Sequence, residues 1–357
     1  MISFPPMKAF CSLTLEDLSA WLQEKGEKPF IAKQLFEWVY QKLVLDFSLM
    51  SNIKKSLREM LLKEFSLPLL KEKRVQTSSD NETLKYLWEL PDGKLVESVL
   101  IMSGERRTVC VSSQVGCPAR CAFCASGKEG LFRNLEKGEI IEQVLLIEKH
   151  LHAKGERVSH IVFMGMGEPL ENYETVVASI DALTNPACFG ISARRITVST
   201  VGIPEKIIRL AEEELKVSLV LSLHAPNQHI RKKIIPYARK YELAELLTAM
   251  DYYFAKTKRD VTFEYTLLKG INDQPEHADE LAELLKNKQC TVNLIPYNPV
   301  DGLNLDRPPK ENIEDFKDRL EKKNICTTWR YTKGKDIAAA CGQLALQHPL
   351  QKTTPLQ

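Results

Sequence analysis

Residues 158–183 read VSHIVFMGMGEPLENYETVVASIDAL and contain one complete unit of strand, loop and helix. The run Val158–Met164 predicts a strand, and Tyr173–Leu183 repeats apolar side chains at the intervals of a helix. The loop between them carries Gly165 and Gly167, which permit a tight turn or a close approach of the backbone to a ligand. A strand followed by a loop and a helix is the repeating unit of an α/β protein with a parallel sheet.

The same unit occurs six times from about residue 105 onward. The other strands are predicted at Thr108–Val115, Arg195–Ser199, Val217–Ser222, Val261–Leu267 and Thr291–Ile295. The other helices are predicted at Lys137–His152, Ile203–Glu214, Leu243–Ala255, Pro275–Lys286 and Asn312–Lys322. Six units are two short of a closed eight-stranded barrel, so we expect an open, partial (β/α)6 barrel with right-handed crossovers and ligands at the C-terminal ends of its strands. Ile325–Tyr331 predicts a further edge strand.

The rest of the chain divides by pattern. Residues 1–70 predict a small N-terminal helical accessory domain whose aromatic residues, such as those of Phe30–Tyr40, form its core. Residues 71–104 predict a β-hairpin extension and linker around the turn Pro91–Lys94. The barrel is expected to span residues 105–345, and residues 346–357 a flexible tail.

The bulk composition is that of a globular protein, with 44% hydrophobic and 27% charged residues. The 49 Lys and Arg against 47 Asp and Glu give a net charge of +2, which neither demands nor excludes a nucleic-acid partner. The sequence has no apolar run of about 18 residues and begins without a basic segment followed by a long apolar one. We therefore expect no membrane association and a cytoplasmic, reducing setting, where clustered cysteines indicate metal binding or catalysis.

Three of the nine cysteines follow the first predicted strand with the spacing C-x3-C-x2-C, at Cys117, Cys121 and Cys124. Thiolates bind iron–sulfur clusters, and four ligands would saturate a cluster of four irons. Three ligands would leave one iron open, as catalysis at a metal requires. The spacing alone leaves open a zinc site with a distant fourth ligand, or three unrelated buried cysteines.

This motif, placed after the first strand of a six-unit barrel, resembles the hallmark of radical S-adenosylmethionine (SAM) enzymes. The resemblance implies a radical SAM partial barrel with a [4Fe-4S] cluster on Cys117, Cys121 and Cys124. The segment Gly165–Pro169 is similar to the superfamily's motif that contacts the methionine amino group of SAM. Its Glu168 carboxylate suits an ammonium group.

Further segments resemble one family, the RlmN dual-specificity RNA methyltransferases that make 2-methyladenine. They are VCVSSQVGC at 109–117, FMGMGEPL at 163–170, STVG at 199–202, LSLHAP at 221–226, NLIPYNP at 293–299, DIAAACGQL at 336–344 and the N-terminal KQLFEW at 33–38. The likeness runs from about residue 10 to 345. It implies methylation at C2 of a specific adenine in 23S rRNA and of an adenine next to the anticodon in some tRNAs.

The resemblance also implies a reaction sequence that uses two SAM molecules per turnover. Cys341 is methylated by the first, and the second is cleaved at the cluster to a radical that takes hydrogen from this methyl group. The carbon radical adds to C2 and links enzyme to RNA, and Glu97 accepts the C2 proton. Cys110 then attacks the sulfur of Cys341, and the resulting disulfide is reset by an external reductant.

The same resemblance assigns cofactor contacts to Gly167, Glu168, Ser199, Ser222, Leu223, His224 and Asn298. It implies 23S rRNA and tRNA as partners, together with a flavodoxin-type electron donor, and we expect a monomer. Cys11, Cys188, Cys290 and Cys326 are interpreted as structural.

Two alternatives stay open at this point: methylation at C8 of adenine, as in the sister antibiotic-resistance group, and a non-catalytic iron–sulfur or zinc RNA-binding module. The chain also departs from many relatives by carrying Lys333-Gly334 where they have Arg-Gly. A lysine retains the charge but cannot bind a phosphate in bidentate fashion. Basic clusters at Lys71–Arg74, Arg106-Arg107, Arg194-Arg195 and Arg231–Lys233 are interpreted as solvated surface or as phosphate contacts.

Overall fold

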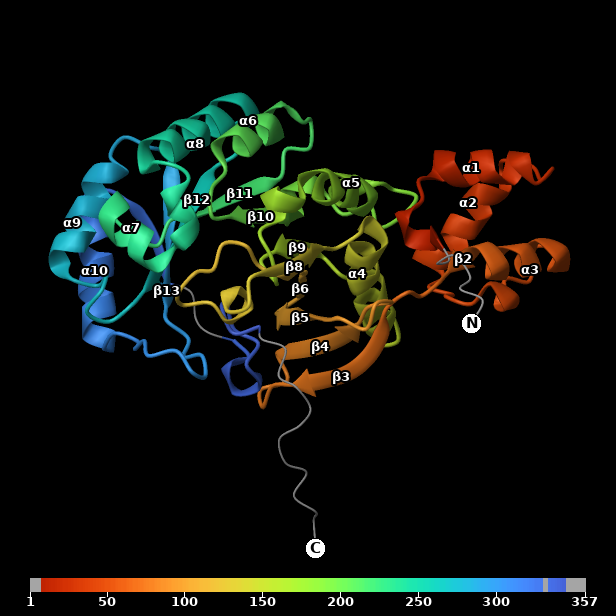
Figure 1. Cartoon of the computed structure of the whole chain (residues 1–357), viewed down its shortest axis with the longest axis horizontal. Helices are drawn as coiled ribbons and strands as arrows, with labels where there is room; N and C mark the ends of the chain where they lie inside the picture. The colour runs from red at the N-terminus through yellow and green to blue at the C-terminus, as the bar shows by residue number, and fades with distance from the viewer. Residues whose placement is uncertain (1–7, 330–332, 345–357) are drawn as a thin grey trace, which may run out of the picture.

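A computed structural model describes residues 8–329 and 333–344. One sheet of ten strands forms its centre, in the order β14-β13-β12-β11-β10-β9-β6-β5-β4-β3 (Figure 1). The parallel part consists of β6 (Arg106–Cys110), β9 (His160–Phe163), β10 (Ile196–Thr200), β11 (Ser218–Ser222), β12 (Val261–Leu267), β13 (Cys290–Pro296) and β14 (Cys326–Trp329).

Helices follow the first six of these strands and cover the outer side of the sheet (Figure 1). They are α4 (Lys137–His152), α5 (Tyr173–Thr184), α6 (Pro204–Glu212), α7 (Gln228–Ile234), α8 (Leu243–Thr257), α9 (Pro275–Leu284) and α10 (Lys310–Lys322). The predicted partial (β/α)6 barrel is thus confirmed, and β14 supplies the predicted edge strand as far as Trp329. The end of that predicted strand, 330–331, and the predicted tail, 346–357, lie outside the described residues.

The first strand differs from its prediction, because Thr108–Val115 does not form one strand. β6 ends at Cys110, and Gln114–Gly116 forms β7, which pairs with β8 (Leu131–Asn134) in a separate small sheet. The backbone N–H of Ser112 donates to Gln143 of α4 (2.9 Å) instead of to a neighbouring strand. Side-chain contacts therefore interrupt the strand just before Cys117.

Three antiparallel strands continue the sheet beyond β6: β5 (Leu95–Ser103), β4 (Thr83–Glu89) and β3 (Lys71–Thr77). The predicted hairpin around Pro91 is present as β4 and β5. β5 pairs directly with β6, so the hairpin extends the barrel sheet. The division of the chain into domains remains a prediction.

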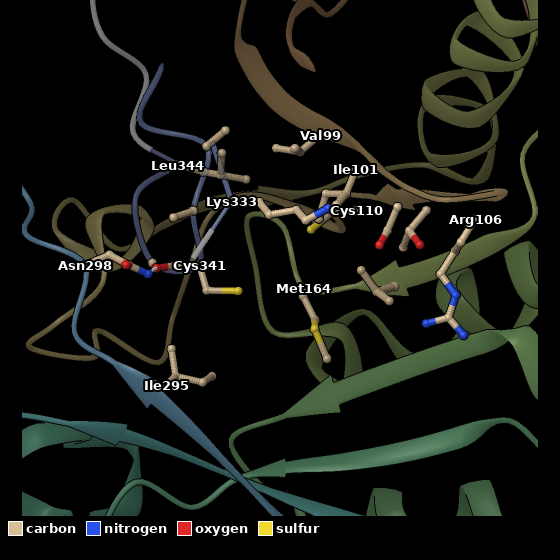
Figure 2. A pocket seen from close by; sticks show the side chains of 16 residues that line it. Val99, Ile101, Arg106, Cys110, Met164, Ile295, Asn298, Lys333, Cys341 and Leu344 are labelled. Atoms are coloured by element: carbon tan, nitrogen blue, oxygen red, sulfur yellow. Dashed lines mark hydrogen bonds between the residues drawn. The ribbon is translucent and has the colours of Figure 1, made fainter. Parts of the chain in front are cut away.

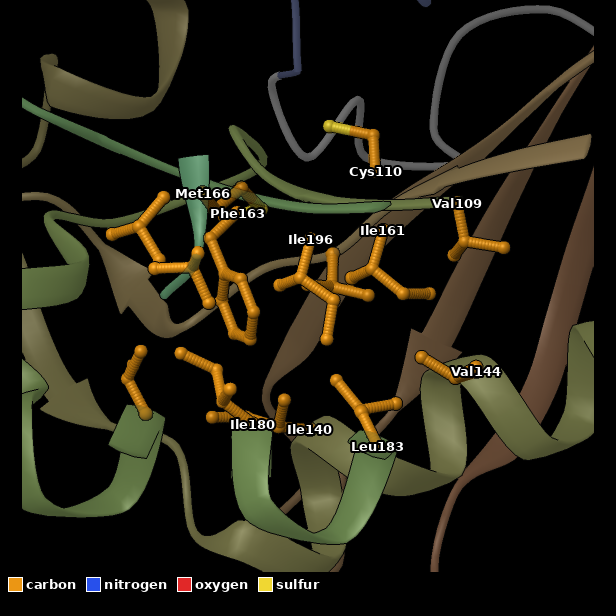
Figure 3. Close-up of a cluster of buried hydrophobic side chains, with 14 of the residues drawn as sticks. Val109, Cys110, Ile140, Val144, Ile161, Phe163, Met166, Ile180, Leu183 and Ile196 are labelled. Carbon is orange, nitrogen blue, oxygen red and sulfur yellow. The ribbon is translucent and has the colours of Figure 1, made fainter. Parts of the chain in front are cut away.

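The hydrophobic core lies between one face of the sheet and the helices that cover it. The strands keep this face toward the helices because its side chains are apolar. Figure 3 shows Val109, Ile161 and Ile196 facing side chains of α4 and α5, among them Ile180. These side chains are completely buried. Since successive residues of a strand point to opposite faces, Cys110 is directed to the other side of the sheet.

The N-terminal region contains α1 (Leu15–Glu24), α2 (Ile31–Phe36), which continues into a π-helical turn over Glu37–Gln41, and α3 (Lys55–Glu64). It docks beside α4 and the loop after α5, where Gln41 donates to the carbonyl of Cys188 (2.8 Å). Phe36 and Tyr40 are buried, as predicted for its core, but Phe30 is 56% exposed and does not belong to it. Among the described helices, none has the length and apolar character needed to cross a membrane.

Candidate active site

Two adjoining cavities lie at the C-terminal ends of the barrel strands. The smaller, of about 130 Å³, is lined by Cys117, Cys121 and Cys124, and is called here the three-cysteine pocket. The larger, of about 360 Å³, is lined by Cys110 and Cys341 and is called the two-cysteine pocket. They share Met164, Ile295, Asn298, Cys341 and Gly342. Cys341 therefore borders both cavities.

The loop that carries the three cysteines is fixed by backbone hydrogen bonds to distant segments. Ala122 donates to the carbonyl of Ile234 at the end of α7 (2.8 Å), and Ala125 donates to that of Gly342 (2.8 Å). Phe123 lines the pocket and packs edge-on against His224, with ring centroids 4.8 Å apart. Phe123 therefore forms part of the apolar wall beside the three cysteines.

The electrostatics of the three thiols favour a bound cationic group. Burial raises the pKa of Cys117 to about 12, and it also raises the pKa values of Cys121 and Cys124. Such thiols stay protonated unless a positive charge stabilises the thiolates, and metal binding supplies that charge.

A single metal ion and an iron–sulfur cluster make different demands on the arrangement of the three thiols. Within the described residues, no three His, Cys, Asp or Glu side chains are grouped so that they could hold one metal ion. In an iron–sulfur cluster the thiolates bind different irons and do not need to converge on one point. The three thiols line one pocket, so the residues present fit such a cluster.

Glu168 follows β9 and is directed into the three-cysteine pocket. Its Oε1 accepts a hydrogen bond from the N–H of Leu170 (3.0 Å) and its Oε2 from that of Val201 (2.8 Å). Burial nevertheless raises the pKa of this carboxyl to about 7. Among the described residues no cation is paired with Glu168, and a carboxylate oriented in this way suits an ammonium group.

Gly167 has φ +110°, and an added Cβ would lie 2.7 Å from the side chain of Gln114. The position therefore requires glycine. Gly167 also lines the three-cysteine pocket, and its contact with a cofactor stays a prediction.

Ser199 and Ser222 lie side by side at the ends of β10 and β11, with their hydroxyl oxygens 3.3 Å apart. His224 follows, and its Nδ1 accepts a hydrogen bond from the N–H of Thr266 (2.9 Å). Burial and the neighbouring Arg231 lower the pKa of His224 to about 3. The ring is therefore neutral and its Nε2 carries the proton, ready to donate to a ligand.

The other predicted contacts differ in placement. Asn298 borders both pockets, and its Nδ2 donates to the carbonyl of Cys341 (3.1 Å). Leu223 is completely buried and does not line either pocket, while its carbonyl accepts from Arg231 (3.2 Å). The structure thus places Asn298, but not the Leu223 side chain, beside the cavities.

Sequence reasoning missed two residues that line the three-cysteine pocket and a buried arginine that bonds to the backbone next to it. Glu264 and Thr266 line it from β12, where a polar residue at alternate positions of an apolar strand was the available signal. Arg231 is 1% exposed and bonds to backbone carbonyls, so interpreting it as surface or phosphate contact was wrong. A local count of basic residues could not reveal this burial.

The two-cysteine pocket holds the remaining predicted cysteines (Figure 2). Cys110 is at the end of β6, whereas Cys341 belongs to the loop after the last described helical turn, Lys335–Ile337. In Figure 2, Asn298 and Cys341 lie at one end of the row of lining side chains and Arg106 at the other. The fold therefore brings together two cysteines from opposite ends of the barrel segment.

Glu97 lies on β5 and is 3% exposed. Its Oε1 is 3.2 Å from the ammonium of Lys85, which also donates to the carbonyl of Ala338 (3.2 Å). Glu97 does not line the two-cysteine pocket itself, although Val99, two residues further along the same face, does. The carboxylate is linked to the Cys341 loop through Lys85.

The chain is similar to known proteins over nearly its whole length. The family model described as "Ribosomal RNA large subunit methyltransferase N-terminal domain" matches residues 9–67, and that of the radical SAM superfamily matches residues 111–285. A probable dual-specificity RNA methyltransferase RlmN 2 of Protochlamydia amoebophila is 66% identical over 332 residues, covering 93% of each chain. A probable RlmN of Geobacillus kaustophilus is 47% identical and covers 98% of this chain and 95% of its own. The crystal structure of a radical SAM methyltransferase from Sphaerobacter thermophilus superimposes with a TM-score of 0.93 at 43% identity, covering 95% of this chain and 99% of the other.

Proposed function

The chain belongs to the RlmN family of the radical SAM superfamily, and from this we propose that it methylates C2 of adenine in RNA. Its substrates are a specific adenine of 23S rRNA and an adenine next to the anticodon of some tRNAs. The observation that carries the proposal is the position of Cys341 between the two pockets. A methyl group on that sulfur would face the cofactor on one side and the base on the other.

The three-cysteine pocket is the proposed cofactor site. Cys117, Cys121 and Cys124 would hold a [4Fe-4S] cluster, which supplies the electron for reductive cleavage of SAM when bound. Glu168 would accept the ammonium group of the methionine moiety, and the protonated Nε2 of His224 would donate to its carboxylate. Ser199 and Ser222 supply hydroxyls from the neighbouring strand ends.

The two-cysteine pocket is the proposed site of the adenine. Cys341 carries the methyl group as a thioether, so one SAM serves as methyl donor and a second supports radical formation. Once the carbon radical derived from this methyl group has added to C2, Glu97, which is paired with Lys85, accepts the C2 proton, and the electrons of the C–H bond stay with the ring. The Cys110 thiolate then attacks the sulfur of Cys341, so that an S–S bond forms while the S–CH2 bond breaks, and the carbon keeps the electron pair and takes up a proton to become the methyl group. The one unpaired electron left by radical addition returns from the ring to the redox couple that supplied it. The methylated base is free, and the disulfide is left for an external thiol reductant.

The proposed function also includes an electron donor, an oligomeric state and a cellular compartment. An electron donor of the flavodoxin type would reduce the cluster, and the enzyme would act as a monomer in the cytoplasm. These points rest on the family resemblance.

Analysis of modified nucleosides tests the proposal. RNA from a strain that lacks this chain should lose 2-methyladenosine from 23S rRNA and tRNA, and expression of the chain should restore it. Persistence of 2-methyladenosine in that strain would refute the proposal, and restoration of 8-methyladenosine instead would establish the C8 alternative.

A second experiment separates the enzyme from a non-catalytic RNA-binding module. Anaerobically reconstituted protein should bind roughly four irons per chain. After reduction in the presence of SAM it should release 5′-deoxyadenosine. A protein with Ala at 117, 121 and 124 should do neither. Release of no 5′-deoxyadenosine by the fully loaded protein would favour the module.

A further inference from the structure

The wall of the two-cysteine pocket is a face of two paired strands, β5 and β6. Their register places Val99 opposite Cys110, Ile101 opposite Thr108, and Ser103 opposite Arg106. All six of these residues line the pocket. Since side chains of alternate residues share a face, the wall is a ladder of three cross-strand pairs.

The chemistry of this ladder changes along its length. At one end Val99 and Cys110 are buried, and at the other Ser103 and Arg106 are exposed. Cys110 lies four positions after Arg106 on the same extended strand, which is about 13 Å at a rise of 3.3 Å per residue. The wall therefore has an apolar end with the Cys110 thiol and a cationic end with Arg106, which is called here the mouth of the pocket. The distance between the two ends is about that spanned by one nucleotide and an arginine side chain.

Other cations near the mouth are already paired. Arg107 faces away from the pocket and binds Glu156 through two nitrogens, at 2.5 and 2.7 Å. Lys333 lines the pocket, but its ammonium binds Glu82 (2.7 Å) and the carbonyl of Met102 (2.8 Å). Lys333, which stands where many relatives have arginine, therefore makes contacts within the protein.

Arg106 differs from Arg107 and Lys333 in its contacts. Within residues 8–329 and 333–344, its guanidinium has no hydrogen bond or ion pair to another side chain. Its charge also acts on a neighbouring strand: burial, and after it the charges of Arg106 and Arg195, lower the pKa of His160, the first residue of β9. A planar cation at the rim of a polar mouth suits an oxyanion with two acceptor oxygens.

We propose that Arg106 binds a backbone phosphate of the target adenosine, so that the two-cysteine pocket is a site for a single nucleotide turned out of the RNA stack. This rests on the proposed function, since it assumes that the base lies between Cys110 and Cys341. The apolar end receives the base and the cationic mouth the phosphate. Arg106 is a positioning residue, and the reacting atoms do not touch it.

Steady-state kinetics with an RNA hairpin that carries the target adenine test this role. Arg106→Ala should raise KM roughly tenfold, as for the loss of a charged hydrogen bond, and leave kcat within about twofold. Arg106→Lys should recover part of the loss. Arg239→Ala, which removes an exposed arginine outside both pockets, is the matched control and should behave as wild type. Unchanged KM in Arg106→Ala would overturn the proposal.

Salt dependence of RNA binding gives a readout that does not require catalysis. The slope of log affinity against log salt should fall by about 0.7 to 0.9 in Arg106→Ala and stay constant in Arg239→Ala. An unchanged slope in Arg106→Ala would contradict a phosphate contact. The two proposals can fail separately. If the wild-type protein makes no 2-methyladenosine but the salt slope still falls in Arg106→Ala, the proposed function is refuted while the phosphate contact of Arg106 is supported.

Competition by mononucleotides identifies the phosphate. Adenosine, 5′-AMP and 3′-AMP are compared as competitors of RNA binding. One monophosphate should compete better than adenosine with wild type and lose this advantage with Arg106→Ala. Which of the two does so tells on which side of the adenosine the phosphate lies. Equal competition by all three with wild type would overturn the assignment.

Discussion

At the scale of single residues, Lys85 and Glu97 form an ion pair that is almost completely removed from solvent, with side-chain exposures of 3% and 4%. A buried charge that loses its partner typically costs about 3–5 kcal/mol, because its desolvation is no longer offset. The second bond of Lys85, to Ala338, joins the pair to the segment before Cys341. The pair therefore couples the position of Glu97 to that of the Cys341 loop.

We expect Lys85→Met to lower the midpoint of thermal unfolding by several degrees and to reduce methylation much more than Lys85→Arg, which keeps the charge. Adding Glu97→Gln to Lys85→Met removes the orphaned charge, so the double variant should regain stability but not activity. Thermal melts and methylation rates of these proteins check both parts. A double variant as unstable as Lys85→Met would exclude the ion pair as the cause.

At the scale of elements, helix α4 contributes a buried carboxyl to the contact with the N-terminal region. Glu142 is completely buried, and its Oε2 accepts hydrogen bonds from the N–H groups of Leu69 (2.5 Å) and Leu70 (3.0 Å). Burial raises the pKa of Glu142 to about 7. The folded protein therefore favours the protonated acid at this position.

The stability of the protein should consequently depend on pH in a defined direction. A carboxyl whose pKa is raised by folding contributes its full stability below about pH 4.5 and loses it as the pH rises through about 7. Wild type should lose up to about 3 kcal/mol relative to Glu142→Gln between pH 5 and 8. Denaturant unfolding of both proteins across this range measures the difference. Parallel pH profiles would show that Glu142 does not titrate in the folded state.

The pattern of strands and helices was predictable, whereas some boundaries were not. Apolar periodicity locates the six strand and helix units, because each strand and helix must bury one face in the same core. The run Thr108–Val115 reads as one strand, but contacts with Gln143 and Met166 end it at Cys110. Partners that lie tens of residues away leave no local signal. Phe30 fits the helical stripe and is nevertheless exposed, because α2 begins only at Ile31.

At the scale of the whole molecule, the candidate site is assembled from the two ends of the barrel segment. The spacing of Cys117, Cys121 and Cys124 is a local pattern and predicts a metal-binding loop by itself. Cys110 and Cys341 have no such pattern, and only the family resemblance singled them out. The structure places both on one cavity, since β6 is central in the sheet and the C-terminal loop returns beside it.

The central claim is that Cys341 carries the new methyl group and that Cys110 releases it. Incubation of Cys110→Ala with SAM, reductant and labelled RNA should produce a covalent protein–RNA species, seen as a retarded labelled band on a denaturing gel. The band should be absent with Cys341→Ala and with the double variant, because neither can carry the methyl group. Methylated RNA released by Cys110→Ala at the wild-type rate, without such a band, would contradict the account.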